Sequence, residues 1–254
     1  MNASGGCDGN CPDGCGIREI TERIRKFIDV IKALDEAPES EGIERFRISS
    51  IEPNLCHDEV IHFVSESKRF MPHFHMPLQS GDDDMLARMR RRYRSDLYTE
   101  RVALIKKLMP HACIGVDVIV GFPGESESRF LNSYNFLNQL DVSYLHVFTY
   151  SERENTVAWD MDGVVDKPLR KERTTQLRGL SEKKRRAFYA RFEGKKASVL
   201  WEGAETNGYM FGFTPNYIKV ARPFDPALTN TISTVMLGEV NPEGLMMARV
   251  PEKA

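Results

Sequence analysis

Apolar residues recur at helical spacing over several stretches of the chain. Between residues 17 and 36 they stand three or four positions apart, as Ile17, Ile20, Ile24, Phe27, Ile31 and Leu34. This spacing predicts an amphipathic helix. Similar patterns predict helices over 57–69, 82–109, 126–140 and 167–192, and the stretch 82–109 divides into two pieces, Asp82–Arg92 and Asp96–Met109.

Four short apolar stretches of strand character alternate with these helices: Arg45–Ile51, Phe74–Leu78, Ile114–Val120 and Tyr144–Tyr150. Strands that alternate with helices predict parallel strands joined by right-handed crossovers. We therefore expect an α/β fold in which these strands form either a sheet or a partial (βα) barrel. Four strands are half the number in a complete eight-stranded barrel.

The pattern changes after residue 193, where short strand-like runs are separated by Gly, Pro and Asn. The runs are Ala197–Trp201, Tyr209–Phe213, Tyr217–Val220, Thr231–Leu237 and Leu245–Val250. They predict a small antiparallel β-barrel. The expected organisation is a cysteine-containing segment with a helix (1–44), a partial α/β barrel (45–193) and a small β-barrel (194–254).

Composition excludes several classes of protein. Of the 254 residues 41% are hydrophobic and the net charge is −2, which excludes a globally disordered chain. No apolar window approaches the ~18 residues of a membrane-spanning helix, and Met1–Gly9 lacks the features of a signal peptide. An odd count of five cysteines without a secretion signal indicates a reducing compartment. We expect a cytoplasmic protein without membrane contact.

Charge is distributed unevenly along the chain. Residues 1–44 carry ten acidic and five basic side chains, whereas residues 169–196 carry eleven basic and three acidic ones. A second basic cluster surrounds Met89 and Tyr93 and consists of Arg88, Arg90, Arg91, Arg92 and Arg94. Such clusters are typical either of a surface that binds a polyanion or of a solvated helix face. The sequence leaves both interpretations open.

Polar residues and glycines follow all four predicted strands of the α/β part. In chain order they are Ser50 and Glu52, then Gln79 and Ser80, then Gly121 and Gly124, then Ser151, Glu152 and Arg153. Ligands bind at the carboxyl ends of strands in parallel α/β folds, so we expect a ligand-binding mouth there. For any single strand, turn formation and helix capping are the alternative explanation for the polar residues and glycines that follow it.

Two histidines alternate on one predicted strand. His73 and His75 face the same side of that strand, a spacing that a pair of metal ligands could use. Because no third ligand stands nearby, histidines that line the core or the mouth are the favoured interpretation. Asp117 stands between Val116 and Val118 and is expected to point to the opposite side of the strand from them, into the barrel interior. A buried carboxylate there needs a partner.

Cys7, Cys11 and Cys15 form the spacing C-x₃-C-x₃-C in a glycine-rich segment. Thiolates that converge in this way bind soft metals, so the spacing predicts a metal or iron–sulfur site. Zinc is an alternative, although a closed zinc site needs a fourth ligand, and an unstructured cysteine-rich terminus is another. Cys56 and Cys113 are expected to be ordinary semi-buried cysteines.

Several motifs in order resemble the methylthiotransferase family of radical S-adenosylmethionine enzymes. They are RISSIEPN (47–54), HFHMPLQSG (73–81), MRRRY (89–93), VDVIVGFPGE (116–125) and HVFTYSER (146–153). The final β-barrel resembles the TRAM domain, an RNA-binding module. Within the family the resemblance is greatest to the branch that modifies threonylcarbamoyladenosine beside the tRNA anticodon.

The resemblance implies a tRNA-modifying enzyme that adds a methylthio group to carbon 2 of that nucleoside by radical chemistry. It implies a [4Fe-4S] cluster on Cys7, Cys11 and Cys15, with S-adenosyl-L-methionine bound at the open iron. The implied cofactor contacts are Ser50, Glu52, Gln79, Ser80 and Gly121, and the implied RNA contacts are Arg90, Arg91, Arg92, Arg153, Tyr217, Lys219 and Arg222. The implied partners are tRNA and an electron donor protein, not DNA.

The chain departs from the family pattern at three points. It lacks the family's separate N-terminal domain, and its third cysteine stands one residue later than in the family's C-x₃-C-x₂-C. Only about 30 residues separate Cys15 from Arg45, where the family has two further strand–helix units. These departures predict a truncated or misassembled gene product, and a compact divergent homologue is the alternative. The alternative function is that of a cluster-free homologue that retains only RNA binding.

Overall fold

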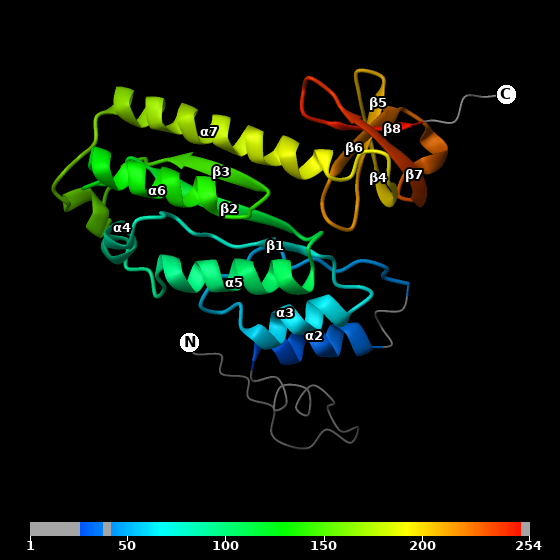
Figure 1. Cartoon of the computed structure of the whole chain (residues 1–254), viewed down its shortest axis with the longest axis horizontal. Helices are drawn as coiled ribbons and strands as arrows, with labels where there is room; N and C mark the ends of the chain where they lie inside the picture. The colour runs from blue at the N-terminus through cyan, green and yellow to red at the C-terminus, as the bar shows by residue number, and fades with distance from the viewer. Residues whose placement is uncertain (1–25, 38–41, 250–254) are drawn as a thin grey trace, which may run out of the picture. The chain divides into compact units, whose positions relative to one another are not determined.

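The computed structural model of the chain describes residues 26–37 and 42–249 (Figure 1). The chain divides into two compact units, residues 1–43 and 44–254. In the first unit the described element is helix α2 (Phe27–Glu36), on which Ile28 and Ile31 are buried. This helix matches the second half of the one predicted over 17–36, and the first half lies outside the described residues.

The second unit begins with a parallel sheet of three strands in the order β1-β2-β3. The strands are β1 (His73–His75), β2 (Cys113–Val120) and β3 (Tyr144–Thr149). Helix α3 (Asp58–Glu66) precedes β1, and two helices, α4 (Asp83–Arg88) and α5 (Ser95–Leu108), connect β1 to β2. Helix α6 (Glu127–Gln139) connects β2 to β3. After β3 come the short helix η2 (Val157–Asp160) and the long helix α7 (Lys167–Ala190). The predicted α/β fold is therefore confirmed, including the two helices within 82–109.

Helices cover one face of this sheet. On β2 the side chains of Ile114, Val116, Val118 and Val120 are buried, and α6 and α7 run alongside β2 and β3 (Figure 1). The inward sides of α5 and α6 are buried too, through Tyr98, Ile105, Phe130 and Leu137. The apolar core of the α/β part thus lies between the sheet and these helices. Among the described helices none is long and apolar enough to cross a membrane.

The prediction of a regular strand over Arg45–Ile51 is wrong. This segment joins the sheet region at two points, through a bridge between Phe46 and Phe70 and through the amide of Ile51, which donates to the carbonyl of His75 at 3.0 Å. Between these two points the amide of His73, which would face this segment, donates to the carbonyl of Met71 at 2.7 Å instead. A continuous strand pairing therefore does not form.

The two outer edges of the sheet are partly covered. Along β3, the Ser181 hydroxyl of α7 accepts a hydrogen bond from the Leu145 amide and donates one to the Leu145 carbonyl, both at 2.8 Å. Ile51 covers one carbonyl of β1 in the same way. Unpaired edge strands tend to pair with other chains, and these contacts occupy backbone groups that would do so.

The last five strands close into a small barrel in the order β4-β5-β6-β8-β7. They are β4 (Lys196–Thr206), β5 (Tyr209–Phe213), β6 (Lys219–Pro223), β7 (Ile232–Val240) and β8 (Met246–Arg249), with the short helix η3 (Pro226–Leu228) between β6 and β7. Trp201, whose indole N–H donates to Ser233 Oγ at 2.7 Å, is fully buried in its core. The predicted barrel is confirmed.

One pairing in the barrel differs from the prediction, because β6 and β8 are parallel. The other four pairings are antiparallel. An odd number of strands cannot close a ring with alternating directions throughout, so a five-stranded barrel contains one parallel pair.

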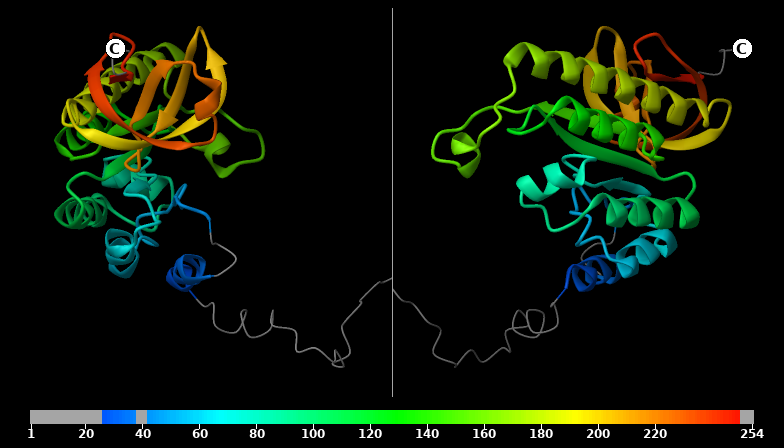
Figure 2. Two further views of the ribbon diagram at one scale, coloured as in Figure 1. Left: turned by 90° about the vertical axis from the view of Figure 1, so that its right-hand side faces the viewer. Right: turned by 60° about the vertical axis from the view of Figure 1, so that its left-hand side comes forward.

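The barrel contacts the α/β part at several places (Figure 2). The amide of Lys219 donates to the Tyr189 hydroxyl of α7 at 3.0 Å, and the Asn216 side chain donates to the carbonyl of His111 at 3.0 Å. The buried Cys113 of β2 belongs to the same apolar cluster as Trp201. Sheet and barrel therefore lie within one compact unit, and the predicted domain boundary at 193/194 stays a prediction.

The two buried cysteines yield a prediction. Burial raises the pKa of both the Cys56 and the Cys113 thiol to about 12, which leaves roughly one thiol in 10⁴ ionised at pH 8. We expect iodoacetamide at pH 8 to leave both unmodified in the native protein and to alkylate both in urea, as measured by mass spectrometry of their peptides. Rapid alkylation of either thiol in the native protein would contradict this packing.

Candidate active site on the open face of the sheet

The face of the sheet opposite to the helices is here called the open face. Parallel pairing places Gly115 of β2 beside both His75 and Tyr144, and Asp117 beside His146. Residues in register on neighbouring strands share a face. The open face therefore consists of His73, His75, Cys113, Gly115, Asp117, Ile119, Tyr144, His146 and Phe148.

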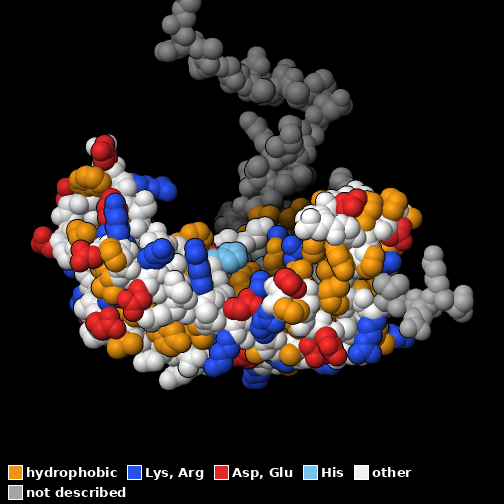
Figure 3. All heavy atoms as spheres, turned by 90° about the horizontal axis from the view of Figure 1, so that it is seen from above, with side chains coloured by type: hydrophobic (Ala, Val, Ile, Leu, Met, Phe, Trp, Pro, Cys, Tyr) orange, Lys and Arg blue, Asp and Glu red, His pale blue; other side chains and the backbone are white. Residues whose placement is uncertain are grey.

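Part of the open face is accessible to solvent. His146 and Phe148 are both exposed, with Phe148 at 52%. The space-filling view in Figure 3 shows histidine reaching the surface in a hollowed region, with lysine and arginine side chains nearby. Chemistry-bearing groups on this face are thus within reach of a ligand.

Three of these side chains converge. The Asp117 Oδ1 atom lies 2.8 Å from His75 Nε2 and 3.6 Å from His146 Nδ1. Asp117 thus points away from Val116 and Val118, as expected, and the register of β1 with β2 places it on the same face as His75. The third partner that the sequence did not reveal is His146, from the start of the HVFTYSER motif.

His73 has a structural role instead. Its Nε2 atom lies 3.0 Å from the Tyr144 hydroxyl, and its ring lies 4.3 Å from the ring of Tyr217. Burial, followed by the charge of Arg47, lowers the pKa of His73 to about 3. The imidazole is therefore neutral and joins the sheet to the barrel, as the favoured interpretation of a core histidine predicts.

The predicted cofactor residues of the first two strand ends lie near this face. Ser50 is exposed, and Glu52 pairs with Arg91 at 3.2 Å. Gln79 adopts a left-handed φ of 73°, its amide donates to the Asp117 carbonyl at 2.8 Å, and it forms a bridge with Val118. Gln79 is thus fixed beside the carboxyl end of β2, and Glu52 is held by its arginine.

Ser80 and Gly121 lie in tighter surroundings. Ser80 is buried, with its hydroxyl 3.4 Å from Ser133 Oγ of α6. Gly121 has a φ of +78°, and a Cβ at this position would lie 2.3 Å from Cγ of Arg170. The close approach that glycine permits here is to that arginine. Whether Ser80 and Gly121 also contact a cofactor stays a prediction.

Two buried polar atoms near the strand ends have no hydrogen-bond partner within the described chain. They are Asn54 Oδ1, from the RISSIEPN motif, and the Tyr150 hydroxyl, directly after β3. Buried polar groups usually have partners, and an unsatisfied one costs about 1–3 kcal/mol. Both atoms are available to a bound polar ligand.

Helix α7 anchors the carboxyl ends of β2 and β3 through two buried arginines. Arg173 pairs with Glu125 at 3.0 Å and with Glu127 at 2.9 Å. Arg170 pairs with Glu152 at 2.5 Å and donates to the Tyr150 carbonyl at 3.1 Å. Part of the basic run 169–196 therefore serves internal contacts rather than a surface.

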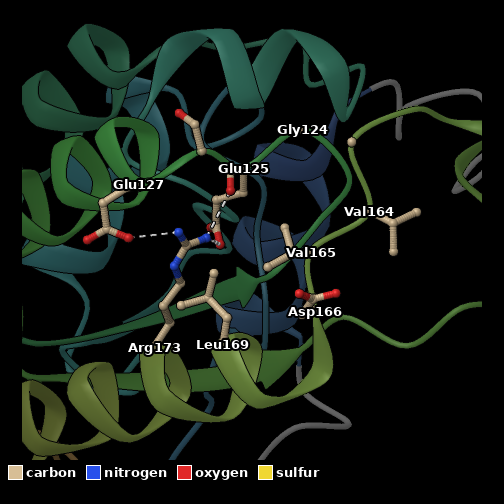
Figure 4. A pocket seen from close by; sticks show the side chains of 10 residues that line it. Gly124, Glu125, Glu127, Val164, Val165, Asp166, Leu169 and Arg173 are labelled. Carbon is tan, nitrogen blue, oxygen red and sulfur yellow. Dashed lines mark hydrogen bonds and ion pairs between the residues drawn. The ribbon is translucent and has the colours of Figure 1, made fainter.

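A cavity of about 430 Å³ opens beside this anchor on the helix side (Figure 4). Its lining includes Glu125, Asp166, Leu169 and Arg173. Burial raises the pKa of Glu125, although hydrogen bonds from the Gly121 amide and Arg173 oppose this effect. The ion pairs that Figure 4 shows between Arg173 and the two glutamates occupy its two terminal nitrogens, while Arg173 Nε is buried without a described partner. This cavity therefore holds a structural ion-pair network.

The predicted RNA contacts fall into two groups. Arg90, Arg92 and Arg153 are all exposed and have no described ion-pair partner. The barrel residues are engaged with other side chains: Tyr217 stacks on Phe213 and carries Arg47 over its ring, Lys219 lies over Phe211, and Arg222 lies over Trp201. Their role in RNA binding stays a prediction. Cys7, Cys11 and Cys15, the predicted cluster ligands, lie outside the described residues.

Sequence comparisons place this geometry in a family. A model of the radical SAM superfamily matches residues 41–137, which include β1, β2 and most of α6. The threonylcarbamoyladenosine tRNA methylthiotransferase MtaB of Bacillus subtilis is 39% identical over 198 residues, which cover 76% of this chain and 44% of that protein. The chain is a homologue of the radical S-adenosylmethionine methylthiotransferases. The predicted resemblance is therefore confirmed.

Other methylthiotransferases match similarly. The tRNA-2-methylthio-N(6)-dimethylallyladenosine synthase of Thermobifida fusca is 38% identical over 169 residues, covering 66% of this chain and 34% of that enzyme. The chain thus spans about half the length of these curated methylthiotransferases or less. Among solved structures, the radical SAM coproporphyrinogen III oxidase HemN of Escherichia coli matches 52% of this chain and 30% of its own, at 15% identity and a TM-score of 0.44.

The anchor on α7 can be tested by substitution. Arg173→Leu leaves the buried carboxylate of Glu125 without its cation, so we expect the free energy of unfolding to fall by about 3–5 kcal/mol. Arg178→Leu, on an exposed position of the same helix, should change it by no more than about 0.5 kcal/mol. Urea unfolding followed by circular dichroism measures both.

The loss in the free energy of unfolding that Arg173→Leu causes should also depend on pH. Without the arginine, burial raises the pKa of Glu125 in the folded state further above its value in the unfolded chain. Such a group contributes stability below its unfolded pKa and loses it as the pH rises. We expect Arg173→Leu to lower the free energy of unfolding by less near pH 4.5 than at pH 8. An equal loss at the two pH values would show that Glu125 is not the group affected.

Proposed function

We propose that this methylthiotransferase homologue adds a methylthio group to carbon 2 of threonylcarbamoyladenosine in tRNA by radical S-adenosylmethionine chemistry. The observation that carries the proposal is the match to enzymes named for this nucleoside. Those of Bacillus subtilis and Aquifex aeolicus match 76% and 78% of this chain. Synthases named for dimethylallyladenosine match between 66% and 87% of this chain at 30–38% identity, whereas the Bacillus subtilis enzyme is 39% identical. The preference for threonylcarbamoyladenosine therefore rests on identity and not on coverage.

The residues around the open face fit S-adenosylmethionine. The ligand carries an ammonium, a carboxylate, a sulfonium and a polar adenine, which together require several hydrogen-bonding groups. Glu52 offers a carboxylate, Gln79 an amide and Ser50 an exposed hydroxyl, and Asn54 and Tyr150 each have a buried oxygen without a partner in the described chain. We propose that these groups, with Ser80 and Gly121 behind them, hold the cofactor at the strand ends.

The iron–sulfur cluster needs thiolates from another part of the chain. In the described part the two cysteines, Cys56 and Cys113, are buried and their thiols have raised pKa values, so neither fits a cluster. We propose Cys7, Cys11 and Cys15 as the ligands. When bound, the cluster supplies the electron that cleaves S-adenosylmethionine, and an electron donor protein would provide it.

For the RNA, Arg90, Arg92 and Arg153 support contacts to phosphates, which are the main source of affinity for nucleic acids. Arg91 holds Glu52 in place at 3.2 Å. We propose that the barrel, residues 194–254, is a TRAM-like domain that binds tRNA, and that the protein acts in the cytoplasm, where tRNA is modified.

The test is anaerobic reconstitution of the full chain with iron and sulfide. We expect about four irons per chain, an electron paramagnetic resonance signal on reduction, release of 5′-deoxyadenosine from S-adenosylmethionine, and methylthiolated threonylcarbamoyladenosine in digested tRNA by mass spectrometry. Cys11→Ser should abolish all four results, whereas Cys56→Ala, which changes a buried cysteine outside the proposed ligands, should retain them.

The alternative function predicts a different combination of results. A chain that retains only RNA binding would bind tRNA with an affinity that falls steeply with salt, would contain no iron and would cleave no S-adenosylmethionine. That outcome would overturn the proposed activity for this chain. Methylthiolation of dimethylallyladenosine but not of threonylcarbamoyladenosine would overturn the proposed substrate alone.

A further inference from the structure

One group of metal-ligating side chains on the open face is used neither by the proposed iron–sulfur site nor by the cofactor contacts. It consists of His75 from β1, Asp117 from β2 and His146 from β3. The parallel register brings the three together, because Asp117 pairs with His146 and stands two residues beyond the partner of His75. Each strand contributes one ligand, so the rigid sheet sets their spacing.

The distances agree with those around a metal ion. One ligand atom from each residue lies within 4.8 Å of the other two, and the two distances to Asp117 Oδ1 are 2.8 and 3.6 Å. Two ligands that each stand about 2.0–2.1 Å from a metal lie roughly 2.9–3.4 Å apart. His75 and Asp117 are already close to this spacing. His146, with 55% of its side chain exposed, has room to rotate towards the other two ligands.

The charge of Asp117 is otherwise unbalanced within the described chain. Its ion-pair partners there are the two histidines, and no described lysine or arginine approaches it within 4.0 Å. Its side chain is 21% exposed, so the carboxylate is partly withdrawn from water. A divalent cation shared with both imidazoles would balance this charge and use all three ligand atoms at once.

The donor set defines the class of metal. Two imidazoles and one carboxylate bind Zn²⁺ and Fe²⁺, whereas Mg²⁺ and Ca²⁺ prefer oxygen ligands. Three protein ligands leave at least one coordination position for water or a substrate atom, as in catalytic metal sites. The exposure of His146 places that open position on the solvent side of the sheet.

We propose that His75, Asp117 and His146 form a second metal site, which binds a divalent transition-metal ion of the Zn²⁺ and Fe²⁺ class on the open face. The site is distinct from the one predicted on Cys7, Cys11 and Cys15. It rests on the described geometry and does not depend on the proposed function.

Cobalt provides the test, because Co²⁺ takes such sites and its absorption spectrum reports the ligands. The full chain without a histidine tag, carrying Cys7→Ser, Cys11→Ser and Cys15→Ser to remove competing thiolates, is titrated with Co²⁺. We expect one ion per chain, visible d–d bands without sulfur-to-cobalt charge transfer, and displacement by Zn²⁺. Absence of such binding would overturn the proposal.

Single substitutions in the same background identify the ligands. Asp117→Asn and His146→Ala should weaken Co²⁺ binding at least about 100-fold, since even the loss of a group that only hydrogen-bonds to a ligand costs about 10–100-fold. His62→Ala, which changes a histidine on α3 outside the site, is the matched control and should bind as the parent does. Binding that is unchanged by Asp117→Asn and His146→Ala would overturn the proposed ligands.

A further readout does not depend on how the variants fold. In the parent, Co²⁺ should shift and broaden the imidazole NMR signals of His75 and His146 and leave that of His62 in place. Perturbation confined to other histidines would contradict the site.

Discussion

The parallel register of β2 with its two neighbours is the constraint on which the rest of the structure depends. It sends Val116 and Val118 into the helix-covered core and brings His75, Asp117 and His146 to the opposite face. Gly115 belongs to the same arrangement, because a Cβ there would lie 2.3 Å from the Tyr144 ring. A slip of one residue would exchange the two faces, burying the carboxylate and exposing the apolar core.

The second constraint is the attachment of α7. Its buried arginines, Arg170 and Arg173, pair with three carboxylates and hold the loops that follow β2 and β3. Farther along, Lys184 donates to the carbonyl of Leu140 at the end of α6, and Arg186 donates to the carbonyl of Asn241 in the barrel. One helix thus fixes the strand ends at one end and reaches the barrel at the other.

Much of the fold can be predicted from the sequence, and the failures share a cause. Periodicity places residues on the two sides of one strand, so the helices and β2 and β3 follow directly. It contains no information about pairing between strands, which is why it turns Asp117 away from its neighbouring valines but does not reveal His75 and His146 as its partners. The break in pairing along Arg45–Ile51 and the parallel contact of β6 with β8 likewise arise between segments distant in the chain.

The sequence also predicts part of the candidate site. Polar residues at strand ends point to Glu52 and Gln79, and the structure holds the first on Arg91 and the second on the backbone of β2. The basic run is harder to interpret, because a count of charges does not distinguish the buried Arg173 from the exposed Arg178. Burial and pairing decide that difference, and both depend on tertiary contacts.

The central claim is that the open face, and not the cavity beside Arg173, is where this chain binds its ligand. The most direct measurement is photocrosslinking of the full chain with an azido-adenine analogue of S-adenosylmethionine, followed by mapping of the labelled peptides. The account predicts label in peptides that carry the strand ends, within residues 50–54, 75–81 and 146–153. Label confined to residues 163–173, which line the helix-side cavity, would contradict it.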